Sequence, residues 1–125
     1  MRQAVHPPGA AAPSAPYSPA ILEGGFVFVS GQGPLDPKTG EYRKGDIRSE
    51  TKQVFENIQS ILAAAGSSMD NVVKVNVYLR DINDFAAMNE VYQTVFTAPY
   101  PARTTIQAGA LPRGFAVEIE CIAKS

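Results

Sequence analysis

The residue best suited to bind a small anion in this sequence is the arginine at position 103. Arg103 lies in the run 101–107, whose threonines and isoleucine are typical of a β-strand. Strand alternation would place Arg103, Thr105 and Gln107 on one face. A guanidinium keeps its charge at any working pH and matches a carboxylate with two parallel hydrogen bonds, so an inward-pointing Arg103 would anchor an acidic ligand. The alternative is an arginine on a solvated face or at a sheet edge.

Two carboxylates in the last apolar run, Glu118 and Glu120, could act together with this arginine. The run 116–123 alternates strictly, with apolar side chains on one face and both glutamates on the other, which predicts a strand. Because the loop before it is short, we expect this strand to pair antiparallel with the strand of Arg103. The pairing would give either a structural ion pair or a site in which the arginine holds an acidic substrate while a carboxylate handles water.

Nucleophilic and zinc chemistry have few candidate residues. The chain has one histidine, His6, and one cysteine, Cys121, which excludes an intrachain disulfide and a Cys/His zinc cluster. His6 lies in a proline-rich segment, where it completes no Ser/His/Asp arrangement unless that segment folds back onto a nucleophile. Cys121 takes the apolar face of its strand, which favours a small buried side chain over a reactive thiol. Carboxylates could still bind a hard cation, but we assign no metal ligand.

The composition favours one folded domain, residues 1–125. The chain is 45% hydrophobic and 18% charged, and its 11 basic and 12 acidic side chains give a formal net charge of −1. That balance, with no basic cluster, argues against a nucleic-acid partner. Residues 1–10 lack the apolar core of a signal peptide, and no apolar run reaches the length of a membrane span. We therefore expect a cytoplasmic protein with no membrane partner.

Hydrophobic spacing indicates the elements that would position these residues. Residues 6–19 are rich in proline and alanine and predict an extended arm, and the apolar runs on either side of Gly24 and Gly25 predict a hairpin. Apolar residues at three- and four-residue steps predict one helix from Asp46 to Gly66 and a second after Asp84. A β-branched run, 72–79, predicts a strand between the helices.

Together these elements predict an α+β fold in which two helices pack on one face of a mixed sheet. The helix between the strands 26–30 and 72–79 implies a crossover that makes these two strands parallel. Phe26 to Val29 is apolar on both strand faces, and two helices cover only one face of a sheet. A small domain rarely leaves so much apolar surface in water, so we predict an oligomer that buries it. Burial between subunits would also allow a pocket there.

Several short segments occur in an order and spacing that together are highly specific. They are 15–18 (APYS), 29–32 (VSGQ), 36–40 (DPKTG), Asn57, 83–85 (NDF), Asn89, 101–103 (PAR) and 118–120 (EIE). Through them the chain resembles the reactive intermediate deaminases, the RidA or YjgF family of enamine and imine deaminases. The resemblance runs from Pro16 to Ala123, and residues 1–16 would form an N-terminal arm.

The resemblance implies a chorismate-mutase-like (YjgF-like) fold in a homotrimer with a central β-barrel, outer helices and active sites between neighbouring subunits. The implied reaction hydrolyses 2-enamino or 2-imino acids to 2-keto acids and ammonia without a cofactor. Arg103 would hold the substrate carboxylate, and Glu118 would position or deprotonate the attacking water. The pocket would be lined by Tyr17, Ser30, Gly31, Asn89 and Thr105. Thr105 stands where many members carry cysteine, which leaves substrate preference open.

Two other functions remain as alternatives. Members of this family have been described as endoribonucleases or translation inhibitors, although the balanced charge and the single histidine argue against RNA cleavage here. Arg103 could also serve a non-catalytic protein that binds small keto or amino acids.

Overall fold

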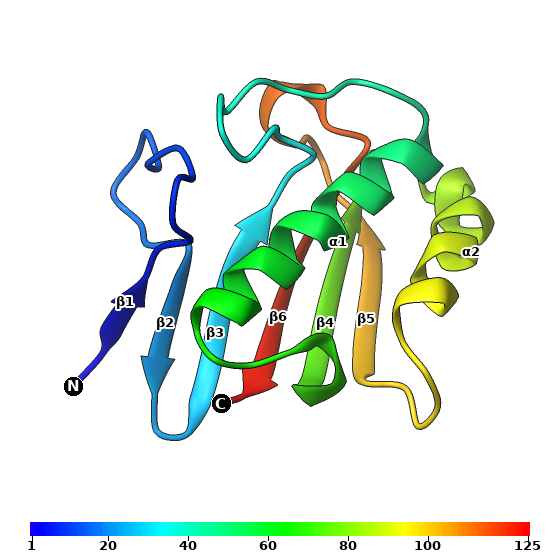
Figure 1. Ribbon diagram of the computed structural model, residues 1–125. Coiled ribbons are helices and arrows are strands. Elements are labelled where there is room, and N and C mark those ends of the chain that lie inside the picture. Colours follow the sequence, from blue (N-terminus) through cyan, green and yellow to red (C-terminus); the bar gives the residue numbers. More distant parts are fainter.

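The computed structural model describes residues 1–125. Its strands, along which buried and exposed residues alternate, form a single sheet. Its strands are β1 (Gln3–Val5), β2 (Ala20–Glu23), β3 (Phe26–Gln32), β4 (Val72–Leu79), β5 (Ala102–Gln107) and β6 (Val117–Lys124). The helices are α1 (Ile47–Ala64) and α2 (Phe85–Val95), with short 3-10 turns η1 (Met69–Asn71), η2 (Ile82–Asp84) and η3 (Pro112–Gly114). The predicted α+β class is confirmed (Figure 1).

The sheet has the strand order β1-β2-β3-β6-β4-β5 and is mixed. Every neighbouring pair is antiparallel except β4 with β5, which run parallel. The hairpin predicted around Gly24 and Gly25 joins β2 to β3, and both glycines have positive φ angles, 61° and 82°. Strands β3 and β4 both run antiparallel to β6, so they point the same way, as the crossover predicted.

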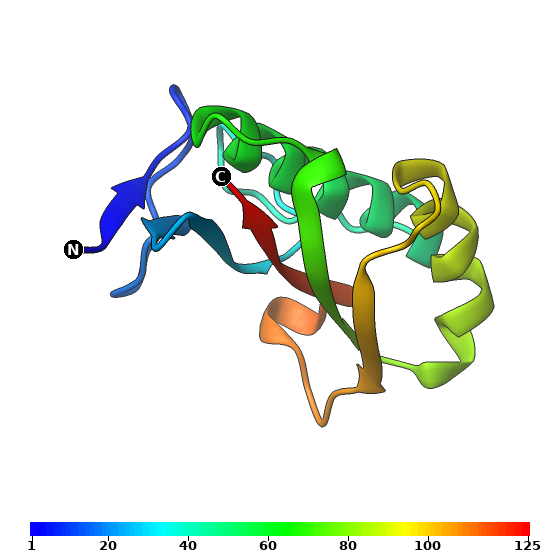
Figure 2. The same ribbon diagram turned by 90° about the horizontal axis from the view of Figure 1, so that it is seen from below.

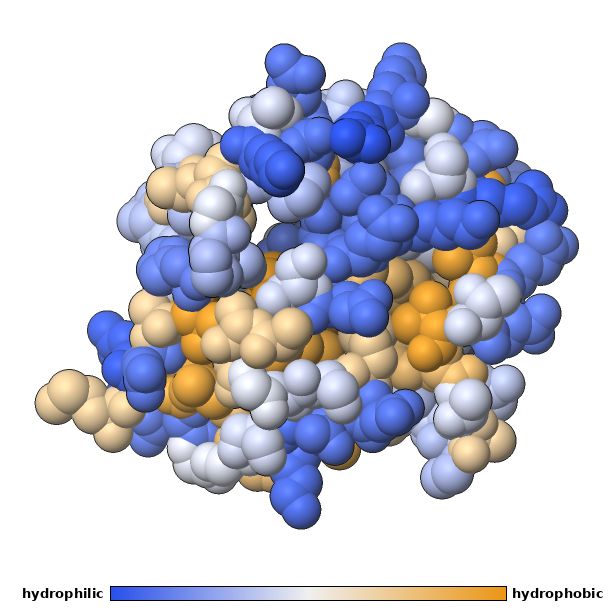
Figure 3. All heavy atoms as spheres, viewed as in Figure 1, coloured by the Kyte–Doolittle hydropathy of each residue, from blue (hydrophilic) through white to orange (hydrophobic).

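Both helices lie on the same face of the sheet, as expected from the sequence (Figures 1 and 2). Helix α1 begins after Asp46, whose side chain accepts a hydrogen bond from the Ser49 backbone N–H at 2.8 Å. It ends before Gly66, whose φ of 77° suits a glycine that terminates a helix. In Figure 3, which faces the helices, hydrophilic residues cover the upper part of this surface and apolar residues show in a band below them.

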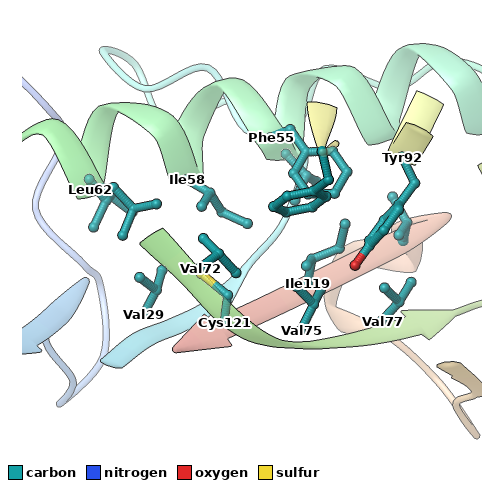
Figure 4. Close-up of a cluster of buried hydrophobic side chains, with 14 of the residues drawn as sticks. Val29, Phe55, Ile58, Leu62, Val72, Val75, Val77, Tyr92, Ile119 and Cys121 are labelled. Atoms are coloured by element: carbon teal, nitrogen blue, oxygen red, sulfur yellow. The ribbon is translucent and has the colours of Figure 1, made fainter. Parts of the chain in front are cut away.

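The core lies between the helices and the sheet. Phe55, Ile58 and Leu62 point from α1 toward the strands, where they meet side chains such as Val29 and Cys121 (Figure 4). These residues are the predicted apolar positions of the helix and of the alternating strands. Burial of a large apolar side chain contributes about 1.5–3 kcal/mol, so this layer fixes the helices relative to the sheet.

The opposite face of the sheet carries no helix. Along β3, Val27 and Val29 are buried under the helices, whereas Phe26 and Phe28 alternate to the open face and remain 41% and 43% exposed. Ile106 of β5 is also exposed on this face. The sequence therefore predicted correctly that β3 is apolar on both sides and that the helices cover one of them.

The predicted hairpin between β5 and β6 is wrong. Strand β5 pairs only with β4, in parallel, and β6 lies between β3 and β4. The central position buries the apolar side of β6, including Val117 and Ile119, which are 0% exposed. The loop 108–116 is long enough to carry the chain past β4 at the top of the sheet.

The N-terminal segment is partly joined to the sheet. Residues 3–5 form β1, which pairs antiparallel with β2. Residues 6–19 form neither helix nor strand and lead back to the start of β2. No helix of the structure is long and apolar enough to cross a membrane.

Candidate active site

Arg103 lies on the helix-covered side of the sheet edge. In the parallel pairing of β5 with β4 it is opposite Val75, which is fully buried, and its neighbour Thr104 points to the open face. Its own side chain is half-buried, so it is neither in the core nor on a fully solvated face. Of the two alternatives from the sequence, the fully solvated face is excluded, whereas the position at a sheet edge is observed, because β5 is the last strand of the sheet.

Helix α2 holds the guanidinium through three side chains. Nη1 of Arg103 donates a hydrogen bond to Oδ1 of Asn89 at 2.7 Å. Its central carbon lies 4.5 Å from the ring centroid of Tyr92 and 5.5 Å from that of Phe85. The spacing i, i+4 and i+7 places these three residues on one helix face. Cation–π contacts contribute about 0.5–2 kcal/mol each, so the arginine is positioned before any ligand arrives.

No carboxylate neutralises Arg103. It takes part in none of the ion pairs of the structure, which join the N-terminus to Glu23, Arg43 to Asp36 and Arg48 to Glu90. A half-buried cation without an acidic partner attracts an anion. It opens into a pocket of about 330 Å³ whose lining consists of Asn89, Tyr92, Gln93, Tyr100, Pro101 and Arg103.

Glu118 lies on the other side of the sheet, facing Gly31. Its Oε2 would be 2.5 Å from a Cβ atom built on Gly31, so the carboxylate occupies space that any other residue at position 31 would need. Burial raises the pKa of Glu118 above its ordinary value, and the nearby charge of Glu120 raises it further. A carboxyl group in that condition can take up and release a proton closer to neutral pH than an exposed glutamate.

A buried glutamate on α1 fixes the start of β6, just before Glu118. Glu50 is 1% exposed, and its Oε1 accepts a hydrogen bond from the Ala116 backbone N–H at 2.9 Å. Its carboxylate also accepts from the Tyr42 hydroxyl and, at 3.2 Å, from the Gly45 backbone N–H. The carboxylate thus joins the loop before α1 to the strand that carries Glu118. Sequence reasoning missed this residue, because its place in the helix gave no sign that both loops meet there.

Tyr17 and Ser30 lie near the end of the arm. The Ser30 hydroxyl donates to the Ser18 carbonyl at 2.6 Å, which ties the arm to β3. Tyr17 is 53% exposed and lines a separate pocket of about 300 Å³ between the arm, the 35–40 turn and α1. That pocket does not contain Arg103.

Five of the expected site residues fall into two groups, and the other two, Tyr17 and Ser30, lie near the arm. Asn89, Arg103 and Thr105 share the helix-covered side, where the Thr105 Oγ1 is buried without a hydrogen-bond partner. Gly31 and Glu118 meet on the open face where β3 pairs with β6, and β4 separates β6 from β5. Within one chain the two groups do not form one pocket, and the ion pair between Arg103 and a glutamate is absent.

Other reactive groups are limited. The structure contains no group of three His, Cys, Asp or Glu side chains that could hold a metal ion. Burial raises the pKa of the Cys121 thiol to about 12, so the nucleophilic thiolate is disfavoured. Cys121 is part of the core under α1, as its strand parity predicted (Figure 4).

Comparison with known proteins gives many similar chains. Residues 8–125 match the family described as Endoribonuclease L-PSP. A 2-iminobutanoate/2-iminopropanoate deaminase of Mus musculus is 44% identical over 123 residues, which cover 98% of this chain and 91% of the mouse protein. The crystal structure of RidA from an Antarctic Psychrobacter species is 46% identical, covers 98% of this chain and 99% of its own, and has a TM-score of 0.92. E. coli TdcF with bound serine is 36% identical, covers 98% of each chain and has a TM-score of 0.91.

The fold and these likenesses define an α+β protein with the YjgF-type six-stranded sheet. The chain belongs to the Endoribonuclease L-PSP family, which is also called the RidA or YjgF family. Relatives in this family carry the name of imine deaminases.

Proposed function

We propose that this protein hydrolyses 2-enamino or 2-imino acids to 2-keto acids and ammonia, with Arg103 binding the substrate carboxylate. The observation that carries the proposal is the guanidinium of Arg103. It is half-buried, is held by Asn89 and the Tyr92 ring, has no acidic partner and faces a pocket. Relatives named for this activity support it, as does the relative whose crystal structure contains serine, an amino acid with a free carboxylate.

The complete site forms between neighbouring copies in a homotrimer. The support is the separation of Arg103 from Glu118 by the sheet, together with an open face that leaves Phe26 and Phe28 exposed. Burying several hundred Å² of that face in each copy would contribute on the order of 10 kcal/mol before the costs of association. In the trimer, the Arg103 group of one copy faces the Glu118 group of the next. Tyr17, Ser30, Gly31, Asn89 and Thr105 complete the lining.

The reaction needs orientation and proton transfer. Arg103 holds the substrate carboxylate, which places the adjacent C=N carbon near a water molecule held by Glu118. Glu118 accepts a proton as the water oxygen bonds to that carbon, and the nitrogen takes up a proton. Glu118 then passes its proton to the nitrogen of the tetrahedral intermediate and accepts the hydroxyl proton, so that the C–N bond breaks, ammonia leaves and the C=O bond of the keto acid forms. Positioned acid and base groups contribute about 10²- to 10⁴-fold to such steps.

A coupled assay tests this function. A pyridoxal-phosphate-dependent dehydratase generates a 2-imino acid from threonine or serine, and the rate of keto acid formation is followed with and without the protein. The wild-type protein should accelerate keto acid and ammonia release, and Arg103→Ala should not, although its oligomeric state is unchanged. No acceleration by the wild-type protein with any 2-imino acid would overturn the proposal.

The same preparation separates the two alternatives. A binding protein would show keto acid or amino acid binding by calorimetry and no ammonia release. An endoribonuclease would cleave RNA and bind it more weakly as salt is added. The only histidine, His6, lies in the arm, so a pair of histidines for RNA cleavage is not present within one chain.

A further inference from the structure

Two polar residues beside Glu118 on the open face, Tyr78 and Glu120, have no role in the proposed reaction as described above. Tyr78 of β4 is directly opposite Glu118 in the β4–β6 register, and Glu120 lies two residues further along the same face of β6. The Tyr78 hydroxyl donates a hydrogen bond to the Glu120 carboxylate. Glu118 itself accepts no hydrogen bond in the structure and lies against Gly31. The Glu120 carboxylate is therefore held by a hydrogen bond, whereas the Glu118 carboxylate is not.

The other titratable groups on this face are Lys74 of β4, Lys124 of β6 and Glu23 of β2, which is opposite Phe26 and pairs with the N-terminal amine. Nζ of Lys74 is directed to the Thr104 hydroxyl at 3.2 Å and forms no ion pair with either glutamate. Strands β3 and β5 contribute only apolar or hydroxyl side chains here, and the helices lie on the other face (Figure 2). Within one chain, Tyr78 and Glu120 are thus the groups that set the electrostatic surroundings of Glu118, and Arg103 of a neighbouring copy would add to them in the proposed trimer.

Tyr78 can act as a donor over the whole working range of pH. Its hydrogen bond to Glu120, followed by burial, raises the pKa of the phenol to about 12. The hydroxyl therefore keeps its proton, and a donated hydrogen bond favours the ionised form of the carboxylate that accepts it.

We propose that Tyr78 is a positioning residue that holds Glu120 as a carboxylate, so that Glu118 is the member of the pair that takes up and releases the proton during hydrolysis. The assignment of Glu118 to water activation rests on the proposed function, and Tyr78 and Glu120 prepare Glu118 for that role. Two neighbouring carboxyl groups resist ionising together, and the one with a fixed donor keeps its charge. The other, Glu118, is left to exchange its proton with water.

The test is a pH titration of Glu118 by carboxyl ¹³C NMR, which needs no enzymatic activity. Glu120→Gln removes the neighbouring charge, so the midpoint of Glu118 should fall by about half a pH unit or more. Tyr78→Phe removes only the hydroxyl and lets Glu120 share the proton, so the Glu118 midpoint should fall as well. Once Glu120 is replaced by Gln, the Tyr78 hydroxyl has no carboxylate to hold. The Glu118 midpoint in the double variant Tyr78→Phe, Glu120→Gln should therefore equal that in Glu120→Gln.

The acid limb of kcat/KM should move to lower pH in the same variants, by the same amounts. A midpoint of Glu118 that does not change in Tyr78→Phe would overturn the inference, as would a double variant that differs from Glu120→Gln. If the midpoints move as expected while the wild-type protein accelerates no imine hydrolysis, the proposed function fails and the role of Tyr78 in setting the charge of Glu118 stands.

Discussion

At the scale of single residues, Arg103 is prepared for a ligand by contacts that leave most of its donors free. A guanidinium has five N–H donors, and Arg103 uses only Nη1, on Asn89. Its central carbon lies 4.5 Å from the centroid of the Tyr92 ring, a contact that uses no donor. The Tyr92 side chain is 5% exposed and reaches from α2 down to the strands (Figure 4). The binding group is thus rigid because of an aromatic residue of the core.

Replacing Arg103 by lysine tests whether the planar fork matters beyond its charge. Arg103→Lys keeps the positive charge but loses the paired donors and the stacking, so kcat/KM should fall about 10- to 100-fold. Steady-state kinetics in the coupled assay measure it. Arg48→Lys is the matched control, since Arg48 is exposed and pairs with Glu90 on the helix surface. Equal activity of Arg103→Lys and the wild-type protein would contradict the role of the fork.

Gly31 has a steric requirement that another glycine lacks. In Gly31→Ala the new methyl would collide with the Glu118 carboxylate, which must then move. A displacement of about 1 Å at a reacting group can cost about 10²-fold, so kcat should fall while the melting temperature changes little. Gly109→Ala is the control, because nothing lies within 4 Å of a Cβ at Gly109. If Gly31→Ala keeps full kcat, as Gly109→Ala should, then Glu118 does not act from its position beside Gly31.

At the scale of elements, much of the fold follows from hydrophobic spacing. The hairpin from β2 to β3, both helices and β4 were predicted, because period-2 and period-3.6 patterns report directly which face is buried. The pairing of β6 was not predicted, since loop length alone cannot tell that the chain passes β4 before it re-enters the sheet. The role of Tyr92 was missed for a related reason. Its place in the apolar stripe of α2 indicated core packing, and only the position of β5 brings Arg103 onto its ring.

The turn before α1 should depend on pH through Asp36. The Asp36 carboxylate accepts hydrogen bonds from the Arg43 side chain and from the backbone N–H groups of Lys38 and Thr39. These bonds, of which the one from Arg43 has the largest effect, lower the pKa of Asp36 from 3.8 to about 2. A lowered pKa means that its stabilising effect is complete above the ordinary value and is lost as pH falls toward 2.

Asp36→Asn should therefore lower the melting temperature at pH 7, and the difference from the wild-type protein should shrink between pH 4 and pH 2. Thermal unfolding followed by circular dichroism at several pH values measures this difference. A gap between the two proteins that is constant from pH 7 to pH 2 would show that the charge of Asp36 does not stabilise the turn.

At the scale of the whole molecule, one face of the sheet is built for contact. Phe26 and Phe28 pack against each other there, with ring centroids 6.3 Å apart, and both are exposed in the single chain. Several polar groups of the proposed site, Glu118, Glu120 and Tyr78, lie on the same face. An assembly that covers the aromatic residues would also enclose these polar groups.

Phe28→Glu tests whether this face forms the interface. A charge there would have to be buried without a partner, so the protein should become monomeric and lose activity while each chain stays folded. Analytical ultracentrifugation and circular dichroism measure the two properties. Gln59→Glu, on the exposed side of α1, adds the same charge away from this face and should leave the oligomer intact. An unchanged sedimentation coefficient for Phe28→Glu would place the interface elsewhere.

The most direct measurement of the shared site mixes two inactive variants. Arg103→Ala keeps Glu118, and Glu118→Gln keeps Arg103, so a trimer that contains both has one site with both native groups. After the two variants are unfolded together in equal amounts and refolded, random assembly should restore about one quarter of the wild-type deaminase activity. No recovery in refolded mixtures that form trimers would contradict the account, because it would mean that both groups must belong to the same chain.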